Sequence, residues 1–190
     1  LAGLSMWLVP TQEECHKLTR ILHIRPSQAK SPSSYPPIDP HVTLAAFPSD
    51  TDLDRVRDSI PPDQPKIPVA FKSIDIGQVY FRSVYAACQP SAALLQLHKA
   101  VHERIKLEPK TPSYPHMSMY YIDDSEAEER TRIRDELVRQ GKIRKVGEDS
   151  VGLDCGEGDF LTGFEGAEIW IVSCEGPVPE WRVLEKVPLV

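Results

Sequence analysis

The chain has 190 residues, of which 41% are hydrophobic and 26% are charged, an ordinary composition for a globular domain. This length suffices for one compact domain with its own hydrophobic core. The formal net charge of −6 argues against sequence-independent binding of long nucleic acid, because such binding draws most of its energy from Lys and Arg on phosphates. No apolar run reaches the length of a membrane span, so we expect no membrane association.

The four cysteines show neither CxxC spacing nor clustered histidines, so the sequence indicates no zinc site. Most of them lie at or near apolar stretches, where a free cysteine behaves as a small buried hydrophobe. Reduced thiols fit a cytoplasmic or nuclear protein, although a disulfide stays open at this level. The apolar start of the chain lacks a basic leader and a small-residue cleavage site, and we interpret it as a buried strand instead of a signal peptide.

Apolar patterning and turn residues predict helices and strands along the whole chain. Thr11 and Glu14 fit a capping box before the first helix, and Ser91 fits the N-cap of the third. The expected helices are 12–23, 52–60, 92–108 and 125–140. The expected strands are 4–9, 41–47, 67–76, 78–88, 116–122, 142–151, 167–174 and 181–187, with a turn at Gly77. The Pro- and Ser-rich stretch 25–39 is expected to be a surface loop, and 152–166 a loop or irregular hairpin.

One phrase of five residues (proline, histidine, apolar, hydroxyl, apolar) occurs twice, as Pro40-His41-Val42-Thr43-Leu44 and as Pro115-His116-Met117-Ser118-Met119. In a β-strand, residues i and i+2 point to the same face. His41 and Thr43 are therefore expected to project together, and His116 and Ser118 likewise. The apolar residues between them turn the other way, into a core.

The order of predicted elements repeats along with this phrase. Each motif strand follows a helix and a proline-containing loop and precedes another helix. We therefore predict an α+β fold, with the single domain 1–190 built from two intimately packed lobes of antiparallel sheet with outer helices. A pseudo-two-fold would relate the lobes, and the motif strands 41–47 and 116–122 would face each other across a central active-site cleft.

Two imidazoles, each beside a hydroxyl, suit acid–base chemistry on a phosphodiester. The unperturbed pKa of histidine is near ~6.5, so one ring can be neutral while the other is protonated. The neutral ring takes a proton from water, the protonated ring gives one to the leaving oxygen, and the hydroxyls hold the non-bridging oxygens. A 2′,3′-cyclic phosphate fits, because its ring opens by this displacement without a metal, and we expect no cofactor.

The paired His-x-Thr/Ser motifs in this order of elements resemble the two-histidine (2H) phosphoesterase superfamily. Within this superfamily, the motif sequences are most similar to those of 2′,3′-cyclic-nucleotide 3′-phosphodiesterases of the fungal and plant type. The similar segments are Trp7-Leu-Val-Pro, Pro-His-Val-Thr and Pro-His-Met-Ser-Met-Tyr-Tyr. The order of helices and strands resembles that of the family over the whole chain, whereas the similarity in sequence is confined to the two motifs and to 77–85.

This resemblance implies that His41 and His116 are the catalytic acid and base, and that Thr43 and Ser118 bind the phosphate. It also implies aromatic residues that stack on the base, for which Tyr121 and then Phe81 are the candidates. The resemblance further implies a stacking tryptophan, for which Trp170 is the available candidate, although we favour a core position for Trp170. The implied products carry a 2′-phosphate, from 2′,3′-cyclic nucleotides or from ADP-ribose 1″,2″-cyclic phosphate, and we expect a monomer acting on a small nucleotide.

Several other functions remain open on the sequence alone. An RNA 3′-end enzyme, trimming RNA or opening a terminal cyclic phosphate, would need Arg82, Lys110 or the basic run 142–145 along its cleft. A 2′-5′ RNA ligase-like activity uses the same chemistry, and a non-catalytic binder of nucleotides or RNA ends would keep the cleft without turnover. His98 and His102 have the i, i+4 spacing of metal ligands but no third ligand nearby, so we predict no metal site.

Overall fold

The computed structural model describes residues 2–190; Leu1, at which the predicted domain begins, lies outside the described residues. The helices are α1 (Gln12–Leu22), α2 (Leu53–Asp58), α3 (Ala92–Ile105) and α4 (Glu128–Arg139), with 3₁₀ turns at Asp124–Glu126 and Val178–Glu180. The strands are β1 (Leu4–Pro10), β2 (Val42–Phe47), β3 (Ile67–Val79), β4 (Arg82–Cys88), β5 (His116–Tyr120), β6 (Ile143–Gly147), β7 (Ser150–Asp154), β8 (Phe160–Leu161), β9 (Gly163–Ser173) and β10 (Arg182–Pro188). Within residues 2–190, no helix is long and apolar enough to cross a membrane.

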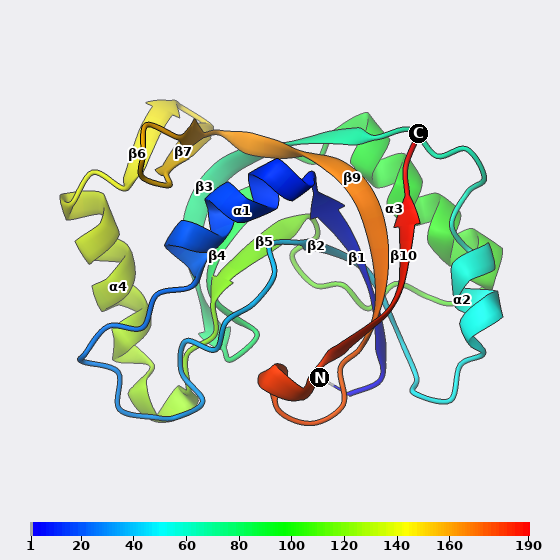
Figure 1. Cartoon of the computed structure of the whole chain (residues 1–190), viewed down its shortest axis with the longest axis horizontal. Helices are drawn as coiled ribbons and strands as arrows, with labels where there is room; N and C mark the ends of the chain where they lie inside the picture. Colours follow the sequence, from blue (N-terminus) through cyan, green and yellow to red (C-terminus); the bar gives the residue numbers. More distant parts are fainter. Residues whose placement is uncertain (1) are drawn as a thin grey trace.

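Seven strands form one antiparallel sheet in the order β1-β2-β5-β4-β3-β9-β10. Strand β9 closes this sheet on itself, because one end pairs with β3 at Ile67↔Gly166 and the remainder pairs with β1 as far as Leu4↔Ser173. Figure 1 shows the resulting curvature and the separate small sheet of β6, β7 and β8. The two motif strands β2 and β5 are direct neighbours, paired at Val42↔Met117.

The helices α1, α3 and α4 bury their apolar sides in one large core with the sheet. Thr11 caps α1 by accepting from the Glu14 N–H, and Ser91 caps α3 by accepting from the Leu94 N–H, so both predicted helix starts are confirmed. This core joins helix residues to the alternate residues of the motif strands, Val42, Leu44, Met117 and Met119. Burying each such side chain contributes about 1.5–3 kcal/mol, which fixes the register of both strands.

The opposite face of β1 and β9 carries a second, smaller apolar cluster. Trp7 and Val9 alternate with Met6 and Leu8 along β1 and therefore leave the large core. They pack with Trp170, Val172 and Cys174, and with the half-buried Trp181. The interpretation of Trp170 as a core residue is confirmed, since its ring is buried here beneath the Lys186 ammonium. The motif side chains project from this second face of the sheet.

The predicted turn at Gly77 is wrong. Gly77 lies inside β3, and the turn to β4 occurs at Tyr80 and Phe81. A Cβ on Gly77 would lie 1.8 Å from the Arg82 carbonyl oxygen, so the glycine is required by close approach of the two strands. An irregular pairing between Ile76 and Val79 accompanies this contact. The consequence is that Tyr80 and Phe81 stand at the tip of the hairpin, beside the cleft.

Several helix and strand ends differ from the sequence prediction by a few residues, and two regions differ in their elements. The predicted strand 142–151 is a hairpin of β6 and β7, and the predicted loop 152–166 contains the end of β7, β8 and the start of β9. These strands are short and interrupted by glycine, so the sequence shows no clear alternation of apolar and polar residues from which their pairing could be predicted. The expectation that the motif strands face each other across a cleft is wrong, because β2 and β5 are hydrogen-bonded neighbours in one sheet. The division into two lobes related by a pseudo-two-fold stays a prediction.

Candidate active site

The six residues predicted for the site line one cleft. It is a cavity of about 110 Å³ whose wall includes His41, Thr43, Phe81, His116, Ser118 and Tyr121. The pairing of β2 with β5 explains this convergence, because residues on either side of the Val42↔Met117 pair share one face of the sheet. The same cleft is also lined by Trp7, Trp181, Arg82 and Lys110.

His41 is held rigidly and is almost fully buried. Its Nδ1 donates to the Asp39 carbonyl at 2.7 Å, and its ring stacks on Trp7 with centroids 3.7 Å apart and planes 7° apart. Since a carbonyl only accepts, this bond places the ring proton on Nδ1 and leaves the Nε2 lone pair free. Burial, helped by the charge of His116, lowers the pKa of His41 to about 4, against the opposing effect of the Asp39 carbonyl.

His116 is bound in the same way but is less enclosed. Its Nδ1 donates to the Ser113 carbonyl at 3.0 Å, and its ring meets the edge of Tyr85 with centroids 5.1 Å apart. Burial lowers the pKa of His116, and the Arg82 guanidinium lowers it further, against the opposing Ser113 carbonyl. Both rings therefore direct Nε2 away from their carbonyl partners, and the His116 side of the cleft carries a nearby positive charge.

The two motif hydroxyls differ in their present partners. Ser118 Oγ donates to the Phe81 carbonyl at 3.0 Å, which ties β5 to the tip of the β3–β4 hairpin. Within residues 2–190, the Thr43 hydroxyl has no hydrogen-bond partner, and its side chain is half-buried in the cleft wall. Both hydroxyls can donate to a phosphate oxygen, Thr43 directly and Ser118 after releasing the carbonyl.

An aromatic wall closes one side of the cleft. The Phe81 ring stacks on Trp181 with centroids 5.8 Å apart and planes 27° apart, and it meets Tyr121 edge-on with centroids 5.2 Å apart. Tyr121 is buried, whereas Phe81 and Trp181 are partly exposed and can contact a planar ligand. Trp7 and Trp181 were not among the predicted site residues. The alternation of side chains along β1 could have identified Trp7 as a residue of the cleft. Trp181 lies in an irregular connection, for which no sequence pattern predicts the position of the side chain.

The positive charges considered for an RNA end separate into two groups. Arg82 and Lys110 line the cleft, whereas the basic run 142–145 lies on and beside the exposed β6 in the small sheet. Of the three alternatives named for an RNA 3′-end enzyme, Arg82 and Lys110 lie in the cleft and the basic run does not. Its strand pairs with β7, and none of its residues contributes to the cleft wall.

His98 and His102 serve structure in this conformation. His98 Nε2 hydrogen-bonds to Thr111 Oγ1 at 2.7 Å, and His102 Nδ1 donates to the His98 carbonyl at 2.7 Å. Within residues 2–190, no group of three or more His, Cys, Asp or Glu is placed to hold a metal ion. The four cysteines are unpaired, and burial raises the pKa of Cys15, Cys88 and Cys174 to about 12.

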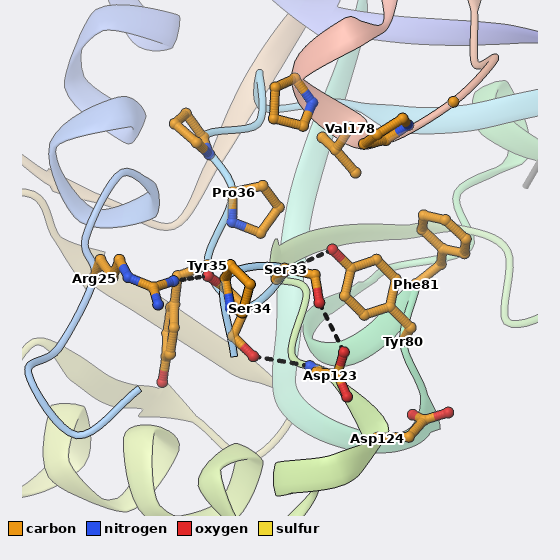
Figure 2. A pocket seen from close by; sticks show the side chains of 15 residues that line it. Arg25, Ser33, Ser34, Tyr35, Pro36, Tyr80, Phe81, Asp123, Asp124 and Val178 are labelled. Atoms are coloured by element: carbon orange, nitrogen blue, oxygen red, sulfur yellow. Dashed lines mark hydrogen bonds between the residues drawn. The ribbon is translucent and has the colours of Figure 1, made fainter. Parts of the chain in front are cut away.

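A second, larger hollow of about 840 Å³ lies beyond Phe81, bordered by the predicted surface loop 25–39 (Figure 2). The loop is tied down, since the Ser33 hydroxyl donates to Asp123 at 2.7 Å and the Tyr80 hydroxyl donates to the Ser33 carbonyl at 2.6 Å. The predicted surface loop is confirmed, since 25–39 contains no helix or strand and about half of its residues are exposed, but Ser34 and Tyr35 within it are buried.

Comparison with known proteins places this arrangement in a family. A family model described as "Cyclic phosphodiesterase-like protein" matches residues 2–189. The chain belongs to this family. The 2′,3′-cyclic-nucleotide 3′-phosphodiesterase of Kluyveromyces lactis is 26% identical over 212 residues, covering 97% of this chain and 98% of that protein. The resemblance to 2H phosphoesterases is thereby confirmed.

Solved structures confirm the α+β, mainly antiparallel fold of this cyclic phosphodiesterase-like chain. A crystal structure of a phosphoesterase aligns with a TM-score of 0.58 at 15% identity, covering 100% of this chain and 99% of that one. Apo LigT of E. coli aligns with a TM-score of 0.59 at 16% identity, covering 100% and 98%. LigT complexed with 3′-AMP aligns at 0.56 and 15% identity, with the same coverage.

Proposed function

We propose that this cyclic phosphodiesterase-like protein hydrolyses 2′,3′-cyclic nucleotides to 2′-phosphates by paired-histidine acid–base catalysis without a metal. The observation that carries the proposal is the convergence of His41 and His116, each beside a hydroxyl, on one cleft. The related phosphodiesterase of Kluyveromyces lactis supports the substrate class. By family likeness, ADP-ribose 1″,2″-cyclic phosphate is a second substrate.

The two rings have different roles in this reaction. His41 is the more enclosed ring, and with a pKa of about 4 it is neutral near pH 7, with Nε2 free to accept a proton. It takes the proton of a water molecule whose oxygen attacks phosphorus. His116, charged once the substrate anion is bound beside it, donates a proton to the 3′ oxygen as the phosphorus–oxygen bond breaks. His41 gains one proton and His116 loses one, so the pair as a whole carries the same number of protons after the reaction. Exchange with solvent then returns each ring to its starting state.

The remaining wall binds the substrate. Thr43 and Ser118 donate to the non-bridging phosphate oxygens, whose charge must be held as the attacking oxygen approaches. Phe81, Tyr121 and Trp181 provide faces and edges for the base. The structures of LigT complexed with 3′-AMP, ATP and NADP+ support a nucleotide as the ligand of this fold.

The residues around the reacting phosphate suit proton transfer better than metal binding. No Asp or Glu lines the cleft among the described residues, and Mg²⁺ and Ca²⁺ bind chiefly through carboxylate and carbonyl oxygens. Each histidine also holds its Nδ1 proton against a carbonyl, which leaves one free nitrogen per ring for the reaction.

The test is incubation with 2′,3′-cyclic AMP in EDTA, with the 2′- and 3′-monophosphates resolved by chromatography. We expect 2′-AMP at a rate that EDTA does not change. A 3′-AMP product would keep the two-histidine chemistry but reverse the ribose in the cleft. Loss of activity in EDTA would refute metal independence, and binding without any turnover would make the protein a nucleotide binder.

An RNA 3′ end carrying a cyclic phosphate is a second candidate substrate. The specific observation in its favour is that Arg82 and Lys110 line the cleft, although the chain as a whole is acidic. An oligonucleotide ending in a 2′,3′-cyclic phosphate, offered in competition with 2′,3′-cyclic AMP, distinguishes the two. RNA binding that uses several phosphates weakens steeply with salt, whereas mononucleotide binding weakens much less.

A further inference from the structure

Among the described residues, Arg82 and Lys110 are the only charged side chains, apart from the two histidines, that line the cleft. Within residues 2–190, neither forms an ion pair with a carboxylate, whereas many other cations of this acidic chain do. Two cations without counter-ions beside a phosphate-processing site are poised to receive an anion.

Arg82 stands behind His116 with respect to the reacting phosphate. Its Nη1 donates to Ser113 Oγ at 2.9 Å, and the carbonyl of the same Ser113 accepts from His116 Nδ1. The Nε2 atom, which points away from Ser113, is the one that meets the reacting group. The guanidinium is therefore held on the Nδ1 side of His116, away from the position of the cyclic phosphate, and four of its N–H groups remain available to another acceptor.

Lys110 comes from a segment that is fixed on the same side. The next residue, Thr111, is hydrogen-bonded to His98, and the His98 ring stacks on Tyr114 at 4.1 Å and 26°. Burial lowers the pKa of His98 to about 4, so this anchor stays neutral and structural near pH 7. The ammonium of Lys110 is exposed and is not committed to another group of the described chain.

The larger hollow beyond Phe81 is less suited to an anion. Its walls are mainly proline and aromatic, and it carries the carboxylates Asp123 and Asp124 against one cation, Arg25, whose guanidinium already donates to the Ser31 and Ser34 carbonyls (Figure 2). In a nucleotide the base is attached to C1′ of the ribose, and the 5′ oxygen is attached through C5′ to C4′. When the base lies on the aromatic wall, a phosphoryl group on the 5′ oxygen is directed to another part of the rim, where repulsion disfavours the acidic side.

We propose that Arg82 and Lys110 form a second phosphate site, which binds a phosphoryl group on the 5′ oxygen of the ribose that carries the cyclic phosphate. The preferred substrate class is then a 2′,3′-cyclic phosphate with a 5′-phosphate, a 5′-pyrophosphate or a 5′ phosphodiester. This inference rests on the proposed function and adds a specificity determinant to it. The site contributes affinity and takes no part in proton transfer.

The experiment compares kcat/KM for adenosine 2′,3′-cyclic phosphate and for the same compound carrying a 5′-phosphate. For the wild-type protein, kcat/KM should be higher for the compound with the 5′-phosphate, on the order of tenfold or more, because charge-assisted hydrogen bonds contribute free energy of this size. Arg82→Gln and Lys110→Gln should each reduce this ratio severalfold. The matched control Lys145→Gln removes one positive charge from exposed β6 and should preserve the ratio.

A binding measurement separates this inference from the proposed function. Calorimetry on His41→Asn compares the dissociation constants of the same two compounds without turnover. If the wild-type protein hydrolyses neither compound, while the 5′-phosphate binds more tightly and Lys110→Gln abolishes that gain, the second phosphate site is supported and the proposed function is refuted. Hydrolysis with equal kcat/KM for both compounds refutes the site and supports the function.

A third substrate identifies the source of the 5′ group. A dinucleotide ending in a 2′,3′-cyclic phosphate carries a 5′ phosphodiester in place of a free phosphate. If its kcat/KM depends on Arg82 and Lys110 as strongly as that of the 5′-phosphate, the site recognises an RNA end. If only the 5′-phosphate and 5′-pyrophosphate compounds gain, the site recognises small nucleotides. A gain that survives both substitutions overturns the proposal.

Discussion

The His41 and His116 sides of the cleft begin from the same phrase of sequence but surround the ring differently. His41 is 5% exposed and lies flat against Trp7, with no cation other than His116 acting on it. His116 is less enclosed, meets only the edge of Tyr85 and has Arg82 nearby. Both rings keep the same hydrogen bond from Nδ1 to a backbone carbonyl.

The duplicated motif therefore determines how the two imidazole rings are oriented, while the residues around each ring determine its pKa. The carbonyl bond orients each Nε2 toward the substrate, so either ring could serve as acid or base by geometry alone. Burial disfavours the imidazolium at both rings, and it lowers the pKa of the deeper His41 as far as about 4. We therefore propose an asymmetric pair, in which His41 accepts and His116 donates a proton.

The largest expected effect tests whether both sides are needed. His41→Ala and His116→Ala each remove one proton-transfer group, and kcat for 2′,3′-cyclic AMP should fall about 10²–10⁴-fold. Steady-state kinetics measures this, with calorimetry of 2′-AMP showing that binding changes far less. His16→Ala, on the exposed side of α1, is the matched control. An unchanged rate for either cleft variant would remove that ring from the mechanism.

A sulfur-substituted substrate separates the two roles. With sulfur in place of the bridging 3′ oxygen, the leaving group departs as a thiolate and needs little help from an acid. The activity lost in His116→Ala should then be largely recovered on this substrate, whereas His41→Ala should stay impaired. Recovery in His41→Ala instead would exchange the assignments of acid and base.

Removal of the Thr43 hydroxyl and removal of the Ser118 hydroxyl should both lower kcat but should differ in their effect on thermal stability. Thr43→Val removes a donor with no other partner in the described chain, and kcat should fall on the order of 10²-fold, as for loss of one donor to a developing negative charge. Ser118→Ala removes a similar donor and also leaves the Phe81 carbonyl without its partner, so we expect lower thermal stability as well. Thermal unfolding should therefore distinguish the two variants, and equal melting temperatures would contradict this account.

The smallest expected effect is on pH dependence. The Arg82 charge lowers the pKa of His116, so Arg82→Gln should raise it. Because the proposed acid must be protonated, the fall of kcat/KM on the basic side should move to higher pH for 2′,3′-cyclic AMP. The limb at low pH, which reports His41, should stay in place. A shift of the basic limb to lower pH would contradict the placement of Arg82.

The motif residues were predictable because their signal is local. A strand alternates its side chains, so the doubled phrase by itself places His41 with Thr43, and His116 with Ser118, on a shared face. The structure brings all four to one cleft, as it does Tyr121 and Phe81. The helix starts were predictable for the same reason, since the capping residues Thr11 and Ser91 bond to groups only three positions along the chain.

The features that sequence patterns missed depend on contacts between distant segments. Trp181 reaches the cleft only because β9 passes from β3 to β1 and the chain then turns back through the connection between β9 and β10. Gly77 resembled a turn residue, but its role is to let β3 approach the Arg82 carbonyl. The loop 25–39 has the composition of an exposed connection, yet carboxylates near α4, almost a hundred residues later, hold it in place. None of these partners lies within a local window of sequence.

The measurement that tests the asymmetric pair most directly is a titration of the free protein by NMR with ¹⁵N-labelled histidine. We predict that the His41 ring stays neutral, with its proton on Nδ1, down to about pH 4. The His116 ring should gain its proton at a higher pH than His41, but below the ordinary value near ~6.5. Protonation of His41 before His116 would contradict the account and transfer the role of base to the other side of the cleft.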